Sequence, residues 1–356
     1  MSESNATADV PWDEYINCIY HSAWGVCVAR FDISGNAKAL QSGASDKHRL
    51  HVFFVCPNPN TKISAKVAKR TINSITMPAN DKQWSSATPG LLIIMIDQSG
   101  SMLAPYDGPD SRTVFASRAV NRIIETIIEK NFDGRAPKNR CFITLIGYNH
   151  NVKTLASGYL KELDEKPIRI ETVKQKISDG AGGILTIDKK MPIWVEPITE
   201  DGATNMKGAF EMAKEIVEKW ISDKPNNPAP VIINISDGVP FFQGLDVSIC
   251  MQQTIEVVDQ IKAIDTSDGK IQIFNAMIGD GTRTKKFPSS KDELEGDEAK
   301  FLFEISTEIP VSYKSVGESK FGMAINNGSR GAVYDVEGVD LINLIDFGSS
   351  KAQGDI

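Results

Sequence analysis

The chain has 356 residues, and its composition excludes several classes of protein. Its 39 Lys and Arg residues against 46 Asp and Glu give a net charge of −7, which argues against a generally cationic nucleic-acid binder. Hydrophobic residues make up 41% and charged residues 24%, the balance of a folded globular protein. The longest purely apolar run, Leu91 to Ile96, is far shorter than the roughly 20 residues that cross a bilayer, so we expect no membrane span.

The first residues and the cysteines both favour a cytoplasmic protein. Residues 1–10 have neither the basic start nor the apolar stretch of a signal peptide. The five cysteines are an odd number, are spread along the chain and contain no CxxC pair. This pattern favours reduced, buried thiols over a disulfide framework or a thiolate zinc site.

The N-terminal region differs in pattern from the rest of the chain. Ile16 to Asp32 and Leu50 to Cys56 have the composition of strands, and Ser64 to Ser74 has the pattern of a helix. Lys82 to Pro89 resembles a linker. We therefore divide the chain into three parts: a β-rich N-terminal extension over residues 1–88, a main domain over residues 89–350 and a tail over residues 351–356.

From about Gly90 onward, apolar runs alternate with amphipathic segments, as in α/β proteins. Nearly continuous apolar runs predict strands buried on both faces over Leu91–Ile96, Cys141–Ile146, Pro230–Ile235 and Ile271–Ile278. Apolar residues three and four positions apart predict helices over Thr113–Lys130, Met206–Ile221, Val247–Ile264 and Glu298–Thr307. A short strand, Ala332–Asp335, and a helix, Val339–Phe347, close the pattern. The predicted fold is a doubly wound, Rossmann-like α/β domain with a mostly parallel sheet flanked by helices.

Residues 158–196 interrupt this alternation. The segment contains the turn formers Gly180, Gly182 and Gly183 between runs of alternating apolar residues. Such alternation is typical of half-buried strands. We therefore predict a β-rich insertion here instead of a crossover helix.

The first predicted strand of the main domain ends in Asp97-Gln98-Ser99-Gly100-Ser101. In a doubly wound sheet the ligand crevice lies beyond the carboxyl ends of the strands. A tight loop at this point could turn the carboxylate of Asp97 and the hydroxyls of Ser99 and Ser101 toward one position. Converging hard oxygen donors suit Mg²⁺ or Mn²⁺ and are poor ligands for zinc or copper.

Two later loops supply the same kind of ligand. Thr204 offers a hydroxyl just before a predicted helix, and Asp237 offers a carboxylate just after the strand Pro230–Ile235. A simpler alternative is that the serines and the threonine cap helices and turns, and that Asp237-Gly238 is an ordinary strand-exit turn. Three matching loops on matching elements favour a metal site.

These three loops, in this order, resemble the von Willebrand factor A (vWA) domain with a complete metal-ion-dependent adhesion site. The similarity covers roughly Thr88 to Ser350. The resemblance implies a six-stranded sheet and an open coordination position that an Asp or Glu of a protein partner fills. It also implies that Mg²⁺, or Mn²⁺, is bound directly or through water by Asp97, Ser99, Ser101, Thr204 and Asp237.

The implied function is that of a metal-dependent protein-interaction module, an adaptor without catalytic activity. Among cytoplasmic members of the family, the chain resembles the bacterial group associated with tellurium resistance, through Leu91–Met102, Ala203–Trp220 and Ile233–Pro240. This implies a protein kinase and a PP2C-type phosphatase as partners in stress-response or defence signalling. A MoxR-type AAA+ ATPase is an alternative partner of the same class. We expect neither nucleic acid nor membrane as a partner.

An enzyme is the alternative of a different class. An aspartate that ends the first strand of such a sheet also resembles the nucleophile of the haloacid-dehalogenase phosphatases. Those enzymes place a second acid two residues later, where this chain has Ser99. The turn Gly279-Asp280-Gly281 resembles their late metal motif, but the acid expected after it is missing. We therefore rank a Mg²⁺-dependent phosphatase that uses Asp97 below an adaptor.

Overall fold

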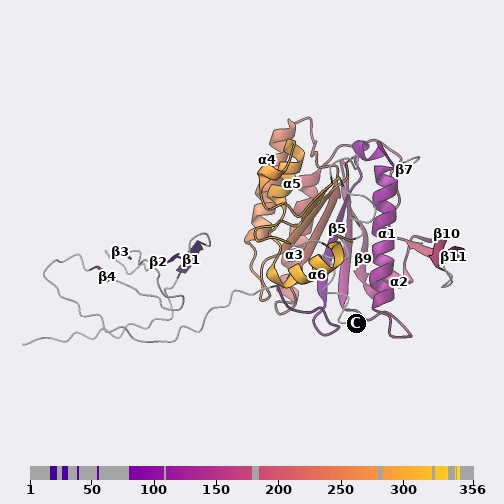
Figure 1. Ribbon diagram of the computed structural model, residues 1–356, viewed down its shortest axis with the longest axis horizontal. Coiled ribbons are helices and arrows are strands. Elements are labelled where there is room, and N and C mark those ends of the chain that lie inside the picture. Colours follow the sequence, from indigo (N-terminus) through magenta and orange to yellow (C-terminus); the bar gives the residue numbers. More distant parts are fainter. Residues whose placement is uncertain are drawn as a thin grey trace, which may run out of the picture. The chain divides into compact units, whose positions relative to one another are not determined.

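The chain divides into two units, residues 1–74 and residues 75–356. The computed structural model (Figure 1) describes residues 17–21, 26–30, 38–39, 54–55, 80–107, 110–178, 184–279, 284–322, 325–335, 341 and 343–344. In the first unit β1 (Asn17–His21) pairs antiparallel with β2 (Val26–Arg30), and β3 (Lys38–Ala39) with β4 (Phe54–Val55). The strand-like segment Ile16–Asp32 thus contains β1 and β2, and the segment Leu50–Cys56 contains β4. The helix expected over Ser64–Ser74 lies outside the described residues.

A seven-stranded sheet in the order β14-β15-β13-β12-β5-β8-β9 forms the centre of the second unit. Its strands are β5 (Gly90–Asp97), β8 (Cys141–Tyr148), β9 (Val152–Tyr159), β12 (Val231–Ser236), β13 (Gln272–Met277), β14 (Lys285–Lys286) and β15 (Ala332–Tyr334). The five inner strands are parallel, whereas the edge strands β9 and β14 run antiparallel to their neighbours. The predicted doubly wound α/β class is confirmed. The implied six strands are wrong by one, because the two-residue β14 extends the edge beside β15.

Helices cover both faces of this sheet (Figure 1). They are α1 (Arg112–Lys130), α2 (Leu160–Glu165), α3 (Met206–Asp223), α4 (Val247–Ala263), α5 (Asp297–Ile305) and α6 (Val311–Phe321). One buried cluster packs α1 and α6 against one face, and another packs α3, α4 and α5 against the other. Alternate residues of β5 enter the two clusters, since successive strand side chains point to opposite faces. This explains why the strand is apolar throughout.

The order of the strands places the carboxyl ends of β5, β8 and β12 next to one another. The chain runs from β5 to β8 on one side, and later returns to β12 on the other side of β5. The winding direction therefore reverses at β5, and ligand crevices of such folds lie at this point. Two short 3₁₀ helices, η1 (Gly100–Leu103) and η2 (Lys291–Glu293), and a small hairpin of β6 (Pro105–Asp107) and β7 (Asp110–Ser111) lie in the connecting segments.

The expected insertion is β-rich but also contains a helix. β10 (Arg169–Ser178) and β11 (Ile184–Ile193) form a hairpin that projects beside α1 (Figure 1). Lys189 of this hairpin pairs with Glu125 and Glu129 of α1, at 3.1 and 3.2 Å. The short α2 was not predicted, because six residues are too few to show a helical period.

The strand predicted over Ala332–Asp335 is confirmed as β15, whereas a helix that precedes it was missed. α6 was not predicted, because its sequence carries no continuous apolar stripe and its Val311 is largely exposed. The helix expected over Val339–Phe347 lies largely outside the described residues. In the part of the chain that the structure describes, no helix is both long and apolar enough to cross a membrane.

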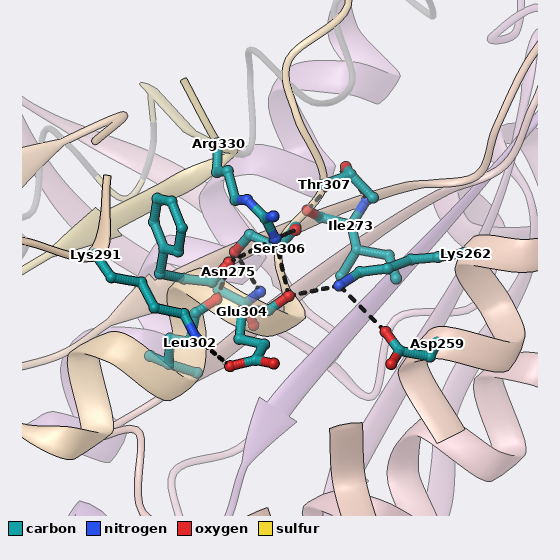
Figure 2. A network of polar contacts seen from close by, with 11 residues as sticks. Asp259, Lys262, Ile273, Asn275, Lys291, Leu302, Glu304, Ser306, Thr307 and Arg330 are labelled. Carbon is teal, nitrogen blue, oxygen red and sulfur yellow. Dashed lines mark hydrogen bonds and ion pairs between the residues drawn. The ribbon is translucent and has the colours of Figure 1, made fainter. Parts of the chain in front are cut away.

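Two cations hold the C-terminal end of α5 (Figure 2). Arg330 Nη1 donates to the backbone carbonyls of Phe303, Glu304 and Ser306, at 3.2, 3.0 and 2.9 Å. Lys262 of α4 donates to the Glu304 carbonyl as well. The last carbonyls of a helix lack partners within it and carry partial negative charge. Arg330 and Lys262 therefore satisfy these carbonyls and fix the end of α5 against the sheet.

Lys262 makes the stability of the protein depend on pH. Burial, followed by repulsion from Arg330, lowers the pKa of Lys262 from 10.5 to about 8. Between about pH 8 and pH 10 the unfolded chain therefore binds more protons than the folded protein, so the free energy of unfolding rises with pH. After allowance for solvent screening, we expect the parent to gain about 1 to 2 kcal/mol over this range relative to Lys262→Met.

Urea unfolding of both proteins across this pH range measures the difference. Methionine keeps an apolar stem and loses the charge, and the comparison cancels the titration of all other groups. The same pH dependence in both proteins would show that the Lys262 ammonium is not penalised by burial.

Candidate metal site

Asp97, at the end of β5, is fully buried and begins a tight loop. Its Oδ1 accepts a hydrogen bond from the Ser99 backbone N–H at 2.8 Å. The Ser99 and Ser101 hydroxyl oxygens lie 3.0 Å apart. The 3₁₀ helix η1 begins at Gly100 and turns the chain so that these oxygens come together. The local geometry expected for the first of the three loops is therefore present.

Backbone hydrogen bonds join the three predicted loops to one another. The Gly100 N–H donates to the Gly202 carbonyl at 2.9 Å, which joins the first loop to the loop of Thr204. Thr204 and Phe241 exchange two backbone hydrogen bonds, of 2.7 and 3.1 Å, which join that loop to the segment after Asp237. The structure thus brings the loops of all five predicted residues to one edge of the sheet.

The end of β8 is a further part of the site that the sequence analysis missed. The Tyr148 carbonyl accepts the Gln98 N–H at 2.7 Å, and the Asn149 carbonyl accepts the Asn205 N–H at 2.9 Å. These bonds attach β8 to the first and second loops. The predicted strand stopped at Ile146, two residues before Tyr148. The position at the carboxyl end of a neighbouring strand is the signal that could have identified it.

Asp201 is a second residue whose place the sequence did not show. A Cβ added to Gly100 would lie 1.5 Å from Asp201 Oδ1, so the absence of a side chain at Gly100 leaves room for this carboxylate. Asp201 Oδ1 also accepts the Gly202 N–H at 2.8 Å. An exposed third carboxylate therefore lies over the first loop.

The two predicted carboxylate ligands repel each other. Burial, followed by repulsion from Asp237, raises the pKa of Asp97 to about 8. Asp97 Oδ2 is buried and has no hydrogen-bond partner among the described residues. Asp237 is also buried, and the Arg112 guanidinium lies 3.6 Å from its Oδ2. Arg112 begins α1, and nothing in its sequence context marked it as a neighbour of the site.

A hard dication fits this arrangement. It would neutralise the repulsion between Asp97 and Asp237 and give the orphaned Asp97 oxygen a partner. The remaining candidate donors, Ser99, Ser101 and Thr204, are neutral hydroxyls that Mg²⁺ and Mn²⁺ accept as ligands. Within the described residues there is no cluster of three or more His, Cys, Asp or Glu side chains that could hold a metal ion. The candidate site is thus a mixed set of carboxylates and hydroxyls.

No protein-family model matches this chain, and a search of curated proteins finds no match. Similar solved structures include the conserved hypothetical protein BatB from Bacteroides thetaiotaomicron, with 17% identity, 53% of this chain and 67% of that chain covered, and a TM-score of 0.31. The manganese-loaded TRAP protein of Plasmodium vivax has 15% identity, 55% and 59% coverage and a TM-score of 0.28. The pilus adhesin SpaC from Lactobacillus rhamnosus GG has 12% identity, 76% and 31% coverage and a TM-score of 0.42.

The matched region spans less than two thirds of the TRAP and SpaC chains. At these identities and TM-scores, the likeness carries no argument about function. What this site can do is therefore decided by its own residues.

Asp97→Asn tests whether repulsion between the two carboxylates destabilises the protein and whether a bound metal ion relieves it. Without added metal, the parent must either protonate Asp97 on folding or bury a second negative charge near Asp237. Asparagine avoids both costs, so we expect the free energy of unfolding of the variant to increase by about 2 kcal/mol. Millimolar Mg²⁺ or Mn²⁺ should stabilise the parent and leave the variant unchanged, because only the folded parent binds the ion.

Thermal unfolding with EDTA and with each metal measures both effects. The matched control is Asp164→Asn, which removes an exposed carboxylate of α2 and should behave as the parent. A destabilised Asp97→Asn protein that still gains stability from Mg²⁺ would contradict the assignment.

Proposed function

We propose that this chain is a metal-dependent protein-interaction module of the von Willebrand factor A type, which captures an acidic side chain of a protein partner. One observation carries the proposal: the buried carboxylates Asp97 and Asp237 follow neighbouring parallel strands and repel each other, and one Asp97 oxygen has no partner among the described residues. Structural carboxylates are normally paired with cations or hydrogen-bond donors. Asp237 has the Arg112 guanidinium and the Val239 N–H as neighbours, whereas Asp97 Oδ2 has none, and this oxygen supports a site built for a dication.

The composition of the site supports capture of a carboxylate. When bound, Mg²⁺ or Mn²⁺ supplies a positively charged coordination position that is open to an oxygen ligand. Asp97 and Asp237 balance the charge of a dication, while Ser99, Ser101 and Thr204 contribute no further negative charge. The Arg112 guanidinium, partly exposed, adds positive charge beside Asp237. The exposed Asp201 carboxylate over the first loop offsets this charge, so the attraction for an incoming Asp or Glu side chain comes from the open coordination position of the ion itself.

The finer proposal rests on the sequence resemblance. We propose a cytoplasmic adaptor in stress-response or defence signalling, with a protein kinase, a PP2C-type phosphatase or a MoxR-type AAA+ ATPase as the partner. In each case the recognition chemistry is the same, because the partner supplies a carboxylate and the adaptor supplies the loops of Asp97, Thr204 and Asp237.

Binding of a defined carboxylate tests the proposal directly. Mn²⁺ alone is first titrated into the protein, and bound Mn²⁺ is followed by the loss of the free-ion electron paramagnetic resonance signal. A short peptide with one Glu is then added to the Mn²⁺-loaded protein, in parallel with the same peptide carrying Gln. We expect the acidic peptide alone to change the relaxation of water protons near bound Mn²⁺, since it displaces water from the ion.

Asp97→Asn should abolish both steps, and Asp164→Asn should preserve both. Equal effects of the Glu and Gln peptides would overturn carboxylate capture, even if the metal binds. Failure of Mn²⁺ to bind the parent would overturn the metal site itself.

We also propose that the chain has no phosphatase activity. Asp97 is fully buried, and its Oδ2 is closed to solvent. A bare cation is smaller than a water molecule and can reach such an oxygen, whereas a nucleophile must meet a bulky phosphoester in line. The turn Gly279-Asp280-Gly281, on which the hydrolase alternative partly depended, lies mostly outside the described residues.

Incubation of the purified parent with Mg²⁺ and a generic aryl phosphate should release no phosphate above the level seen with Asp97→Asn. Release by the parent that Asp97→Asn abolishes would replace the adaptor with a hydrolase.

A further inference from the structure

A line of buried polar side chains crosses the sheet from the candidate site to α5. The Tyr148 hydroxyl donates to Asn234 Oδ1 at 2.8 Å, and Asn234 Nδ2 donates to Asn275 Oδ1 at 3.0 Å. Asn275 Nδ2 donates to the Ser306 hydroxyl at 2.8 Å, and that hydroxyl donates to the Leu302 carbonyl at 2.7 Å. The residues Tyr148, Asn234, Asn275 and Ser306, all with 0% exposure, are called the polar chain below.

All hydrogen bonds of the polar chain have the same donor-to-acceptor direction, which is set by the Leu302 carbonyl at its far end. A backbone carbonyl only accepts, so the Ser306 hydroxyl must give its hydrogen to Leu302 and accept from the Asn275 amide. The Asn275 oxygen then faces Asn234 and accepts from its amide. The Asn234 oxygen is left to accept the hydrogen of Tyr148. A single carbonyl of α5 thus orients every member of the polar chain.

The far end of the polar chain is firmly held. Figure 2 shows Asn275, Ser306 and Leu302 beside Arg330, whose Nη1 donates to the Ser306 carbonyl at 2.9 Å. Ser306 is the C-cap residue that follows α5. Because the guanidinium also donates to the carbonyls of Phe303 and Glu304, the end of the helix is tied to the segment that leads into β15.

The near end reaches both sides of Asp237. Ser236 follows Asn234 by two residues on β12, so its side chain is on the same face of the sheet and lies beside the Tyr148 hydroxyl. The Ser236 oxygen accepts the Gly238 N–H at 3.1 Å. Since the Tyr148 hydrogen is committed to Asn234, the phenolic oxygen has only lone pairs left for the Ser236 hydroxyl. The Ser236 oxygen is then oriented to receive the Gly238 N–H. The polar chain therefore positions the loop that carries Asp237 through Ser236.

Stability does not explain amide and hydroxyl groups in the middle of this sheet. Burying such groups costs free energy unless each hydrogen bond is made, and well-packed apolar residues serve a core at least as well. A fully satisfied network instead imposes one geometry, because each donor has one correct position. The residues around the polar chain on β12 and β13 are almost all apolar, so these positions stand out as specifying geometry.

We propose that Tyr148, Asn234, Asn275 and Ser306 are positioning residues, through which the end of α5 sets the position of Asp237 at the metal site. The inference rests on the proposed function, because it assigns a metal ligand to Asp237. It adds that residues on β13 and α5, which contact no ligand, control the affinity of the site.

Ser306→Ala is the variant that tests the inference, since it removes the far end of the polar chain and leaves the site residues in place. We expect the dissociation constant for Mn²⁺ to rise by about 10-fold, as when outer-shell partners of metal ligands are lost. Ser306→Thr keeps the hydroxyl and should restore the parent affinity. Isothermal titration with Mn²⁺ alone measures all three proteins.

Thr254→Val is the matched control. The Thr254 hydroxyl is equally buried on α4 and donates to the Cys250 carbonyl at 2.7 Å, so its removal deletes the same kind of bond away from the site. We expect a similar loss of stability with unchanged Mn²⁺ affinity. An equal loss of affinity in Thr254→Val would show that general destabilisation, and not the polar chain, weakens the site.

Tyr148→Phe and the double variant with Ser306→Ala test whether both ends act through one route. Because either change interrupts the same chain, the double variant should bind Mn²⁺ no more weakly than Tyr148→Phe alone. Additive losses would overturn the inference.

Amide exchange of Gly238 in the metal-free protein separates this inference from the proposed function. We expect the exchange rate to increase several-fold in Ser306→Ala and to stay unchanged in Thr254→Val, because only the former loosens the Ser236 hydroxyl. If the parent binds no Mn²⁺, the proposed function fails, and the exchange rate of the Gly238 amide alone tests whether the polar chain positions the Asp237 loop. Unchanged exchange in Ser306→Ala would overturn the positioning role.

Discussion

Repulsion between Asp97 and Asp237 is the constraint around which the site is arranged. The parallel pairing of β5 with β12 brings both carboxylates to the same edge of the sheet, so neither can turn away without leaving its strand end. Asp237 is partly relieved by Arg112, whereas burial leaves Asp97 with the larger penalty. A fold that keeps two such groups together must hold them with many other bonds. The loop-to-loop hydrogen bonds, the contacts of β8 and the polar chain supply these bonds.

The sequence predicted the parts of the fold whose pattern is local. Continuous apolar runs located β5, β8, β12 and β13, because strands buried on both faces leave no polar positions. Short or weakly patterned elements escaped prediction, as α2, α6 and β14 show. Their places are set by tertiary contacts that a single sequence does not display. The five candidate ligands were identified because each follows a strand or precedes a helix.

Arg112, Asp201 and Tyr148 could not be found in the same way. Arg112 reaches Asp237 across more than one hundred intervening residues, and Asp201 lies in a loop whose sequence has no periodic pattern. The Tyr148 hydroxyl donates to Asn234 on β12, while its carbonyl accepts the Gln98 N–H of the first loop. Their importance arises from the strand order, in which β5 lies between β8 and β12. Hydrophobic periodicity predicts which face of an element is buried, but it does not predict which strands and loops lie side by side.

The bonds between the loops have a consequence for how ions enter and leave. The pairs Gly100–Gly202 and Thr204–Phe241 are backbone hydrogen bonds that involve none of the candidate ligand atoms. The loops are therefore ordered before an ion arrives, and the entropy of ordering them belongs to folding instead of binding. A metal site preorganised in this way would exchange its ion without refolding, so its occupancy would follow the surrounding metal concentration promptly. The loops would then already have the arrangement of the ion-bound state, and only the ion would be added.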